Sequence, residues 1–239
     1  MLEAKIGWSR GSARGIEVAG TARLCLNDNH ETGIDYMNFY RVKGPSLWGD
    51  YGRLLTGGMA RPGASEAEPM LLLRTGPFIP PISFPFRHVV VTDAFREKID
   101  ASGLFNFNYG HVIKKHIAKV NWERWDRSAE KPHKYPRGGE PEGYILNRWH
   151  SRRAAKQMGV VWELLLERGA DTASQKIEGQ LRRKVMVNPS SWDGQHFFRS
   201  KNQGWYVASV EGAEWFHQNC EDWVSLDPCI EWDPDAAEQ

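Results

Sequence analysis

Apolar and polar residues alternate with a period of two along much of this chain, which is the pattern of strands with one buried face. The alternation is clear at 14–26, at Met37–Val42 and at 112–122. Two short apolar runs, Met70–Arg74 and Val89–Val91, are typical of buried strands. The chain is therefore predicted to consist mainly of strands.

One short helix is predicted directly after the strand at Val89–Val91. Thr92 or Asp93 can cap its start, and Gly103 can supply the left-handed residue that ends it after Ser102. Two apolar residues four positions apart give this helix one buried face: Phe95 and Ile99.

The middle of the chain is less regular. Ser151 can cap a second helix that runs to about Gln157, and Gly159 leaves Val160–Leu166 either as its continuation or as a strand. Lys176–Met186 is a candidate strand with a basic face. Glycine and proline predict long loops over 43–69 and 126–143.

A strand, a capped helix and a second strand occur in this order twice. The first set lies within 75–125 and the second within 188–232, where Ser209 takes the capping position. We therefore expect an α+β fold with a strand-dominated mixed sheet or sheets, a few short helices and a duplicated strand–helix–strand unit. The expected organisation is an N-terminal part of strands and loop (1–69) and a main α+β region (70–239), together in one compact domain.

Composition limits the classes of partner. The 239 residues are 41% hydrophobic and 26% charged, with a formal net charge of +1. This balance argues against a protein that binds nucleic acid over its whole surface or lies on an anionic membrane. No apolar stretch is long enough to cross a bilayer. We expect no nucleic-acid partner and no membrane.

The charges are unevenly distributed along the chain. Basic residues outnumber acidic ones between His111 and Lys156. From Asn202 to Gln239 there is no Lys or Arg but a series of acidic residues. The two blocks either face each other within the fold, or the acidic end meets a basic partner.

Cysteine usage and the N-terminus favour a cytoplasmic protein. The cysteines are Cys25, Cys220 and Cys229, without CxxC spacing, so neither a zinc site nor a disulfide framework is predicted. The first residues lack the basic and apolar regions of a signal peptide. No metal or other cofactor is expected.

The common catalytic motifs are absent from the sequence. There is no GxSxG, no P-loop and no HExxH, and the glycines at 11–15 match no dinucleotide-binding pattern. His116 with Asp126, or His196 with Asp193, are the acid–base pairs that a search offers, and such pairs arise by chance in any chain with this many histidines. We expect no enzymatic activity, with an enzyme that uses an unrecognised acid–base site as one alternative.

A second alternative is an RNA-binding module. The basic clusters Lys114–His116 and Arg182–Lys184, together with Trp122, Trp125 and Trp149, can form a basic aromatic face. Solvated faces of strands explain these clusters more simply.

Two stretches resemble predicted immunity proteins of bacterial polymorphic-toxin and type VI secretion systems. One runs from Arg74 through the proline-rich turn to the helix that follows Val91, and the other runs from Trp192 to the helix around Trp215. The resemblance is one of pattern: a turn, a strand ending in a hydroxyl or acidic residue, a helix, and a turn into a strand. It covers about half of the chain, and residues 1–69 match nothing in it.

The resemblance implies a non-enzymatic inhibitor that binds a cognate toxin, one acting in the cytosol such as a nuclease. It indicates no site residues. Tight binding to a basic enzyme is favoured by aromatic anchors and an acidic rim. On that ground the acidic end of the chain is the predicted contact face: Glu211, Glu214, Trp215, Glu221, Asp222, Trp223, Asp227, Glu231 and Trp232.

Overall fold

The computed structural model of this protein describes a set of ranges: 36–48, 50–61, 68–121, 126, 128–130, 139–177 and 183–237. Residues 33–239 form one compact unit, and the account below concerns that unit alone. The strand predicted over 14–26 lies outside the described residues, as do Cys25, Trp122, Trp125 and Arg182. Within the described ranges, no helix is both long and apolar enough to pass through a bilayer.

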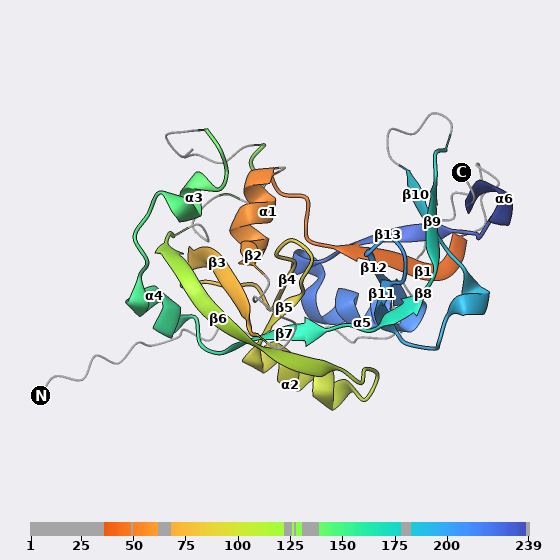
Figure 1. Cartoon of the computed structure of the whole chain (residues 1–239), viewed down its shortest axis with the longest axis horizontal. Coiled ribbons are helices and arrows are strands. Elements are labelled where there is room, and N and C mark those ends of the chain that lie inside the picture. Colours follow the sequence, from red (N-terminus) through yellow and green to blue (C-terminus); the bar gives the residue numbers. More distant parts are fainter. Residues whose placement is uncertain are drawn as a thin grey trace, which may run out of the picture. The chain divides into compact units, whose positions relative to one another are not determined.

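The described residues form a seven-stranded sheet and a six-stranded sheet with a few short helices (Figure 1). This confirms the predicted strand-dominated α+β class. The strands are β1 (Tyr36–Lys43), β2 (Met59–Arg61), β3 (Met70–Gly76), β4 (Ile82–Ser83), β5 (Val90–Thr92), β6 (Asn108–Lys119), β7 (Val161–Leu165), β8 (Arg168–Ala170), β9 (Thr172–Gln175), β10 (Lys184–Val187), β11 (Phe197–Ser200), β12 (Tyr206–Ser209) and β13 (Ser225–Ile230). The helices are α1 (Asp50–Gly57), α2 (Asp93–Ser102), α3 (Gly143–Leu146), α4 (Arg152–Gln157), α5 (Val210–Cys220) and α6 (Pro234–Ala237), with 3₁₀ turns η2 (Pro189–Ser191) and η3 (Glu221–Trp223).

The two sheets share one topology. The order β4-β5-β7-β6-β3-β2 in one sheet matches β11-β12-β1-β13-β10-β9 in the other, where β8 is an additional edge strand. The directions match as well. Among the matched pairs, β6/β3 and its counterpart β13/β10 are parallel and the others are antiparallel. The additional strand β8 pairs with β11 in parallel. The predicted recurring unit is present as β5–α2–β6 and β12–α5–β13.

The two halves exchange one strand each. Along the chain, each half has a first strand (β1 or β7), two pairs of strands, a helix and a last strand. β1 lies in the sheet of the second half, between β12 and β13, while β7 lies in the sheet of the first half, between β5 and β6. Neither sheet can therefore be completed by its own half of the chain.

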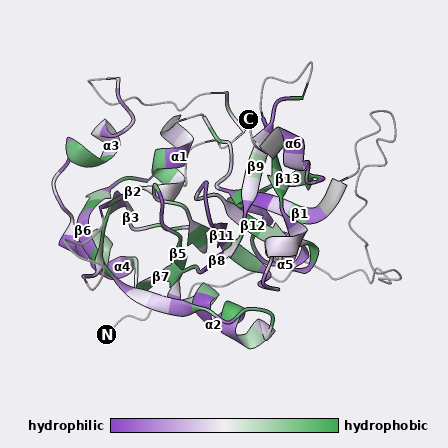
Figure 2. Ribbon diagram, turned by 45° about the vertical axis from the view of Figure 1, so that its right-hand side comes forward, coloured by the Kyte–Doolittle hydropathy of each residue, from purple (hydrophilic) through white to green (hydrophobic). Residues whose placement is uncertain are grey.

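The largest core cluster joins the two sheets and both matched helices. It includes Val91 from β5, Phe95 from α2, Phe197 from β11 and Phe216 from α5. Figure 2 shows the hydrophobic stretches of β5 and β11 that contribute to it. Each large side chain that is fully buried in this way contributes about 1.5–3 kcal/mol to folding.

The helix that follows β5 forms as its sequence predicts. The N–H of Phe95 donates to Thr92 Oγ1 over 3.3 Å, and Gly103 ends the helix with φ of 64°. Phe95 and Ile99 are buried. The predicted cap at Ser151 is also present, because its hydroxyl accepts the N–H of Ala154.

The long loop predicted over 43–69 is wrong for its middle part, which holds α1 and β2. Its glycines suggested a loop, but Gly52 is needed inside the helix: a Cβ there would lie 1.7 Å from the carbonyl oxygen of Leu47. Gly58 has φ of 80° and follows the last residue of α1. Both glycines are therefore required by the close packing and the end of helix α1, and they do not mark a flexible loop.

In three other segments the structure decides between helix and strand, or gives strand bounds that differ from those predicted from the sequence. Residues after Gly159, whose φ is 74°, become the strand β7 and not a continued helix. The strand predicted over Lys176–Met186 begins only at Lys184 among the described residues. The strand predicted over 112–122 starts earlier, at Asn108.

Arg74 is an exception to the apolar character of the core. It lies on β3 beside Ile117 of β6, and its side chain is fully buried. Its Nε donates to the carbonyl of Thr75, but within the described residues neither terminal guanidinium nitrogen has a hydrogen-bond partner. Burial lowers the pKa of Arg74 to about 9. A buried cation without a counter-charge is costly.

We expect Arg74→Met to raise the free energy of unfolding by about 1–3 kcal/mol, because it removes the unpaired charge and keeps most of the volume. Urea denaturation at neutral pH measures this. Arg74→Gln, which leaves a buried polar group, should be less stable than Arg74→Met. A methionine variant less stable than the wild type would refute the idea.

Candidate functional site

The predicted acidic contact face centres on α5 and η3. The buried side of α5 holds Ala213 and Phe216, and the three-residue spacing of Glu211 and Glu214 places these two on another side of the helix. Glu221 follows directly, on η3. Glu211 and Glu221 are exposed and Glu214 is half-buried. The structure therefore brings this part of the predicted set together on two consecutive elements.

The later residues of the predicted set are arranged differently. Asp222 is exposed on η3, and Glu231 is exposed just after β13. Asp227, on β13, forms a 2.5 Å ion pair with Lys43 of β1. Because Lys43 compensates its charge, Asp227 adds little to an acidic surface.

The three predicted tryptophan anchors are packed within the protein. The ring of Trp215 lies 5.5 Å from that of Phe95 and 5.1 Å from that of Phe105, so it ties α5 to α2. Trp223 packs against Phe78 at 5.6 Å, and Trp232 packs against the small cluster around Met186. All three side chains are half-buried and pack against core clusters, so none projects fully into solvent.

Ser209 caps α5 through a small polar network. The N–H of Gly212 donates to Ser209 Oγ over 3.3 Å, and the hydroxyl donates to Glu211 Oε2 over 2.7 Å. His196 Nδ1 lies 2.8 Å from Ser209 Oγ. Because the Ser209 hydroxyl donates its proton to Glu211, His196 Nδ1 carries a proton and donates it to Ser209 Oγ. The hydrogen bond from Ser209 is the main reason that the pKa of Glu211 lies below its usual value.

The combination of serine, histidine and glutamate resembles a nucleophilic triad in composition only. Ser209 is 2% exposed, and its oxygen already accepts two hydrogen bonds and donates one. A nucleophile needs a free lone pair directed at a substrate. The network therefore stabilises the start of a helix.

Neither acid–base pair offered by the sequence forms. Asp126 bonds to Ser128 and not to His116, and Asp193 bonds to Gln195 and not to His196. A pair that the sequence gave no reason to select does form: His88 Nδ1 lies 2.5 Å from Glu163 Oε1, both side chains being largely buried. It joins the start of β5 to β7, which is one of the exchanged strands.

No cysteine-based or metal-binding centre is assembled in the described part of the chain. Cys220 and Cys229 are buried free thiols, and burial raises the pKa of each to about 12. Among the described residues, no three His, Cys, Asp or Glu side chains are grouped to hold a metal ion.

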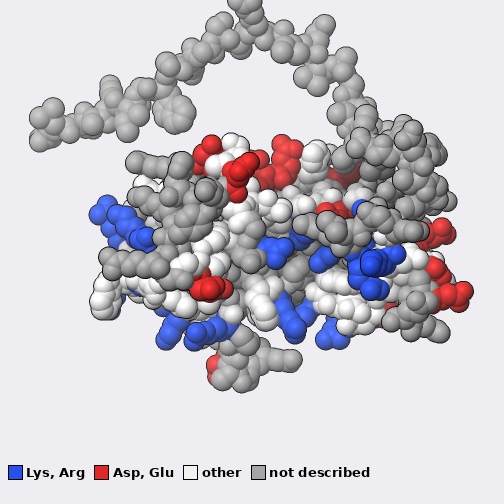
Figure 3. Space-filling view, turned by 90° about the horizontal axis from the view of Figure 1, so that it is seen from above, with Lys and Arg blue, Asp and Glu red and all other residues white. Residues whose placement is uncertain are grey.

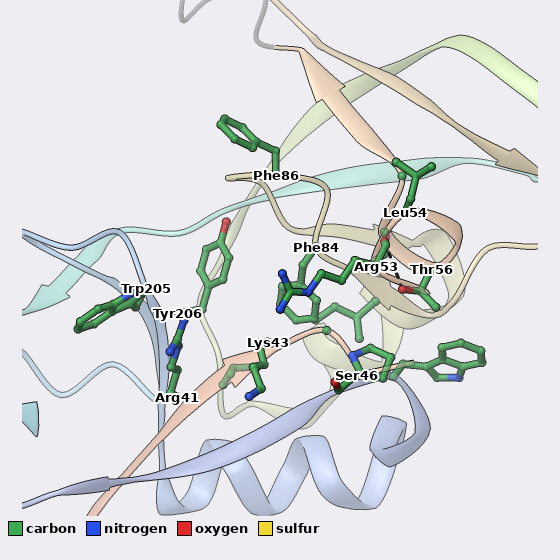
Figure 4. A pocket seen from close by; sticks show the side chains of 18 of the residues that line it. Arg41, Lys43, Ser46, Arg53, Leu54, Thr56, Phe84, Phe86, Trp205 and Tyr206 are labelled. Carbon is green, nitrogen blue, oxygen red and sulfur yellow. Dashed lines mark hydrogen bonds between the residues drawn. The ribbon is translucent and has the colours of Figure 1, made fainter. Parts of the chain in front are cut away.

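One pocket lies between β1, α1 and the two matched hairpins, and its volume is about 520 Å³ (Figure 4). Aromatic rings and cations share its wall: Phe84, Phe86, Trp205, Tyr206, Trp223, Arg41, Lys43 and Arg53. Figure 4 shows Arg53, Phe84 and Tyr206 gathering toward its middle. Among the residues that line it, Glu142 is the single carboxylate.

A second, smaller pocket of about 260 Å³ shares Gly204 with the first. Its wall is polar and holds four cations: Arg87, Arg168, Arg199 and Lys201. Figure 3 shows most red atoms of this face at its upper edge and right-hand end, and most blue atoms over its middle, left-hand end and lower edge, with one red group among the blue.

Sequence reasoning missed both pockets. The cations of the smaller pocket are spread from Arg87 to Lys201, and no local cluster marks them. The most exposed aromatic residues are Trp149 (94%) and Phe86 (75%), of which only Trp149 belongs to a group predicted from sequence.

No family model matches the chain, and no curated protein matches it.

Removal of the α5 cap tests the network around Ser209. We expect Ser209→Ala to lower the free energy of unfolding by about 1–2 kcal/mol, because the N–H of Gly212 and His196 lose their acceptor. Thr92→Ala at the matched position of α2 is the control, with a single bond to lose and a cost of about 1 kcal/mol. Equal losses in chemical denaturation would contradict the larger role of Ser209.

The lowered pKa of Glu211 predicts a small pH dependence of stability. Its ionised form stabilises the fold above its unfolded pKa of about 4.3, and this contribution is lost as the pH falls through the lower, folded pKa. Because the side chain is exposed, Glu211→Gln should cost no more than about 0.5 kcal/mol at pH 7. The difference from the wild type should shrink as the pH falls below about 4.3, and a difference that does not depend on pH would contradict this assignment.

Proposed function

We propose that this protein is an immunity protein: it binds a cognate secreted toxin and neutralises it by protein–protein contact. One observation carries the proposal. Three carboxylates lie on or directly after helix α5, whose inner side is fixed in the core: Glu214 on α5, and Glu221 and Asp222 on η3.

A fixed acidic surface suits a basic partner. Because α5 is held by Phe216 and Trp215 against the rest of the core, its carboxylates need little ordering when a partner binds. Complementary charge also accelerates the encounter of two proteins. We expect the toxin to be an enzyme with a basic active-site cleft, such as a nuclease that acts in the cytosol.

Two features of the predicted contact face are revised in this proposal. Asp227 is left out because Lys43 pairs with it, and Glu211 contributes mainly to the cap of α5. Trp223 is a half-buried side chain next to Asp222, and it would contact the toxin at the edge of the acidic face.

The direct test is protection from a toxin. The toxin domain encoded next to this protein should be expressed in bacteria with and without it, and survival should be restored only when both are present. Co-purification of the two proteins should accompany protection. If the chain neither binds nor protects against that toxin, the proposal fails.

Reversal of charge on the acidic face gives a sharper prediction. Glu221→Lys with Asp222→Lys should lower the association rate constant about tenfold at low ionic strength and much less at high salt, because long-range attraction is lost. Stopped-flow or surface-based kinetics measure this. The dissociation rate constant should change less.

The control is the same change of charge at another exposed position. Glu140→Lys with Glu130→Lys alters two exposed carboxylates that precede α3, which lies apart from α5 in Figures 1 and 2. If both double variants slow association equally, net charge and not this face governs binding. An unchanged rate for the α5 variant would remove the face from consideration.

A further inference from the structure

The turns of the two matched hairpins meet beside the pockets described above. The β4–β5 turn contributes Phe86 and Arg87, and the β11–β12 turn contributes Lys201 and Gly204. The ring of Phe84, at the start of the first turn, lies 5.8 Å from that of Tyr206, at the end of the second. The duplicated topology thus places two equivalent turns beside the same two adjoining pockets.

The smaller pocket concentrates positive charge. Arg87, Arg168, Arg199 and Lys201 line about 260 Å³, and no carboxylate lies among the lining residues. Within the described residues, none of the four forms an ion pair with a carboxylate. Arg168 and Lys201 donate only to backbone carbonyls, which hold their positions without cancelling their charge.

Gly204 keeps the space for one of these cations. It has φ of 69°, and a Cβ at this position would lie 3.2 Å from Nη2 of Arg199. The guanidinium of Arg199 therefore packs over the bare backbone of the turn. A side chain at 204 would strain the backbone and displace the guanidinium.

The larger pocket supplies flat apolar surfaces next to this charge. Trp205 carries the guanidinium of Arg41 at 5.4 Å from its ring centre, and Phe84, Phe86 and Tyr206 add further rings. The hydroxyl of Tyr206 is buried and has no hydrogen-bond partner within the described residues. Burial raises its pKa, so the hydroxyl remains a donor.

We propose that the two adjoining pockets form one binding site for a nucleotide. The four cations of the smaller pocket would hold the phosphates, because one guanidinium group can donate two parallel hydrogen bonds to two oxygens of a phosphate. The rings of the larger pocket would contact the base, since bases stack on aromatic side chains. The volume of about 520 Å³ lies within the range of small-molecule sites.

This site differs in chemistry from the acidic face of α5, and it does not depend on the proposed function. The net charge of +1 led to the expectation of no nucleic-acid partner. That argument concerns the average over the whole chain, whereas the two hairpin turns gather cations locally. A nucleotide is favoured over an acidic peptide because the smaller pocket is lined by cations without aromatic rings, whereas the rings lie in the adjoining larger pocket.

Calorimetry of the full chain with three probes tests the site. Pyrophosphate should bind, ADP should bind at least tenfold more tightly, and adenosine should bind most weakly. ADP should also quench the fluorescence of Trp205, seen as a difference from Trp205→Phe. Affinity for pyrophosphate should fall with rising salt.

Variants separate a built site from general attraction to positive charge. Arg87→Gln with Arg199→Gln should weaken pyrophosphate and ADP about a hundredfold, or about tenfold for each charged hydrogen-bond donor lost. Gly204→Ala should weaken both through Arg199 without changing the net charge. Arg152→Gln with Arg153→Gln, two exposed cations on α4, is the matched control and should leave affinity unchanged. Thermal unfolding confirms that each variant is folded.

Several outcomes would overturn the proposal. One is the failure of both pyrophosphate and ADP to bind at millimolar concentration, and another is a control variant that loses as much affinity as the arginine variant. ADP no tighter than pyrophosphate would remove the aromatic half of the site. Binding of an oligoribonucleotide without binding of ADP would replace the nucleotide with a nucleic-acid strand, and binding of an acidic peptide alone would replace it with a protein segment.

Discussion

The exchange of β1 and β7 between the two sheets is the constraint on which the rest of this structure depends. Each of these strands fills the centre of a sheet whose other matched strands come from the opposite half of the chain. Removing a central strand would leave two rows of backbone hydrogen-bonding groups unpaired, which is far more costly than losing an edge strand. The halves are thereby obliged to fold together.

The core reinforces that coupling. α2 and α5 occupy matched positions after β5 and β12, and both contribute to one cluster in which Trp215 contacts Phe95 and Phe105. The hydrogen bond between His88 and Glu163 adds a polar link between the residues just before β5 and the exchanged strand β7. Backbone pairing, aromatic packing and one hydrogen bond between side chains thus act on the same junction.

Both proposed surfaces arise from this arrangement. The acidic face is the outer side of α5, whose inner side the shared core fixes in place. The nucleotide site lies where the turns of two equivalent hairpins meet, and it gathers cations from β8, β11 and both turns. A single chain of this topology can therefore present an anionic surface and a cationic pocket on separate elements.

The sequence by itself determined the local elements whose signals are short-range. Period-two alternation predicted β1 and β6, a short apolar run predicted β3, and the hydroxyl caps at Thr92, Ser151 and Ser209 predicted the starts of three helices. The recurrence of strand, helix and strand was also readable from the order of these signals. The acidic character of α5 followed from composition alone.

Only the tertiary structure decided what joins these elements. Helix α1 was hidden because Gly52 looks like a loop residue until the carbonyl of Leu47 is seen packed against it. The inward positions of Trp215, Trp223 and Trp232 depend on neighbours far away in the chain, as does the pairing of Lys43 with Asp227. The pairing of β1 with β12 and the cationic pocket combine residues more than a hundred positions apart. No local pattern encodes such contacts, because they are set by how the two sheets close on one core.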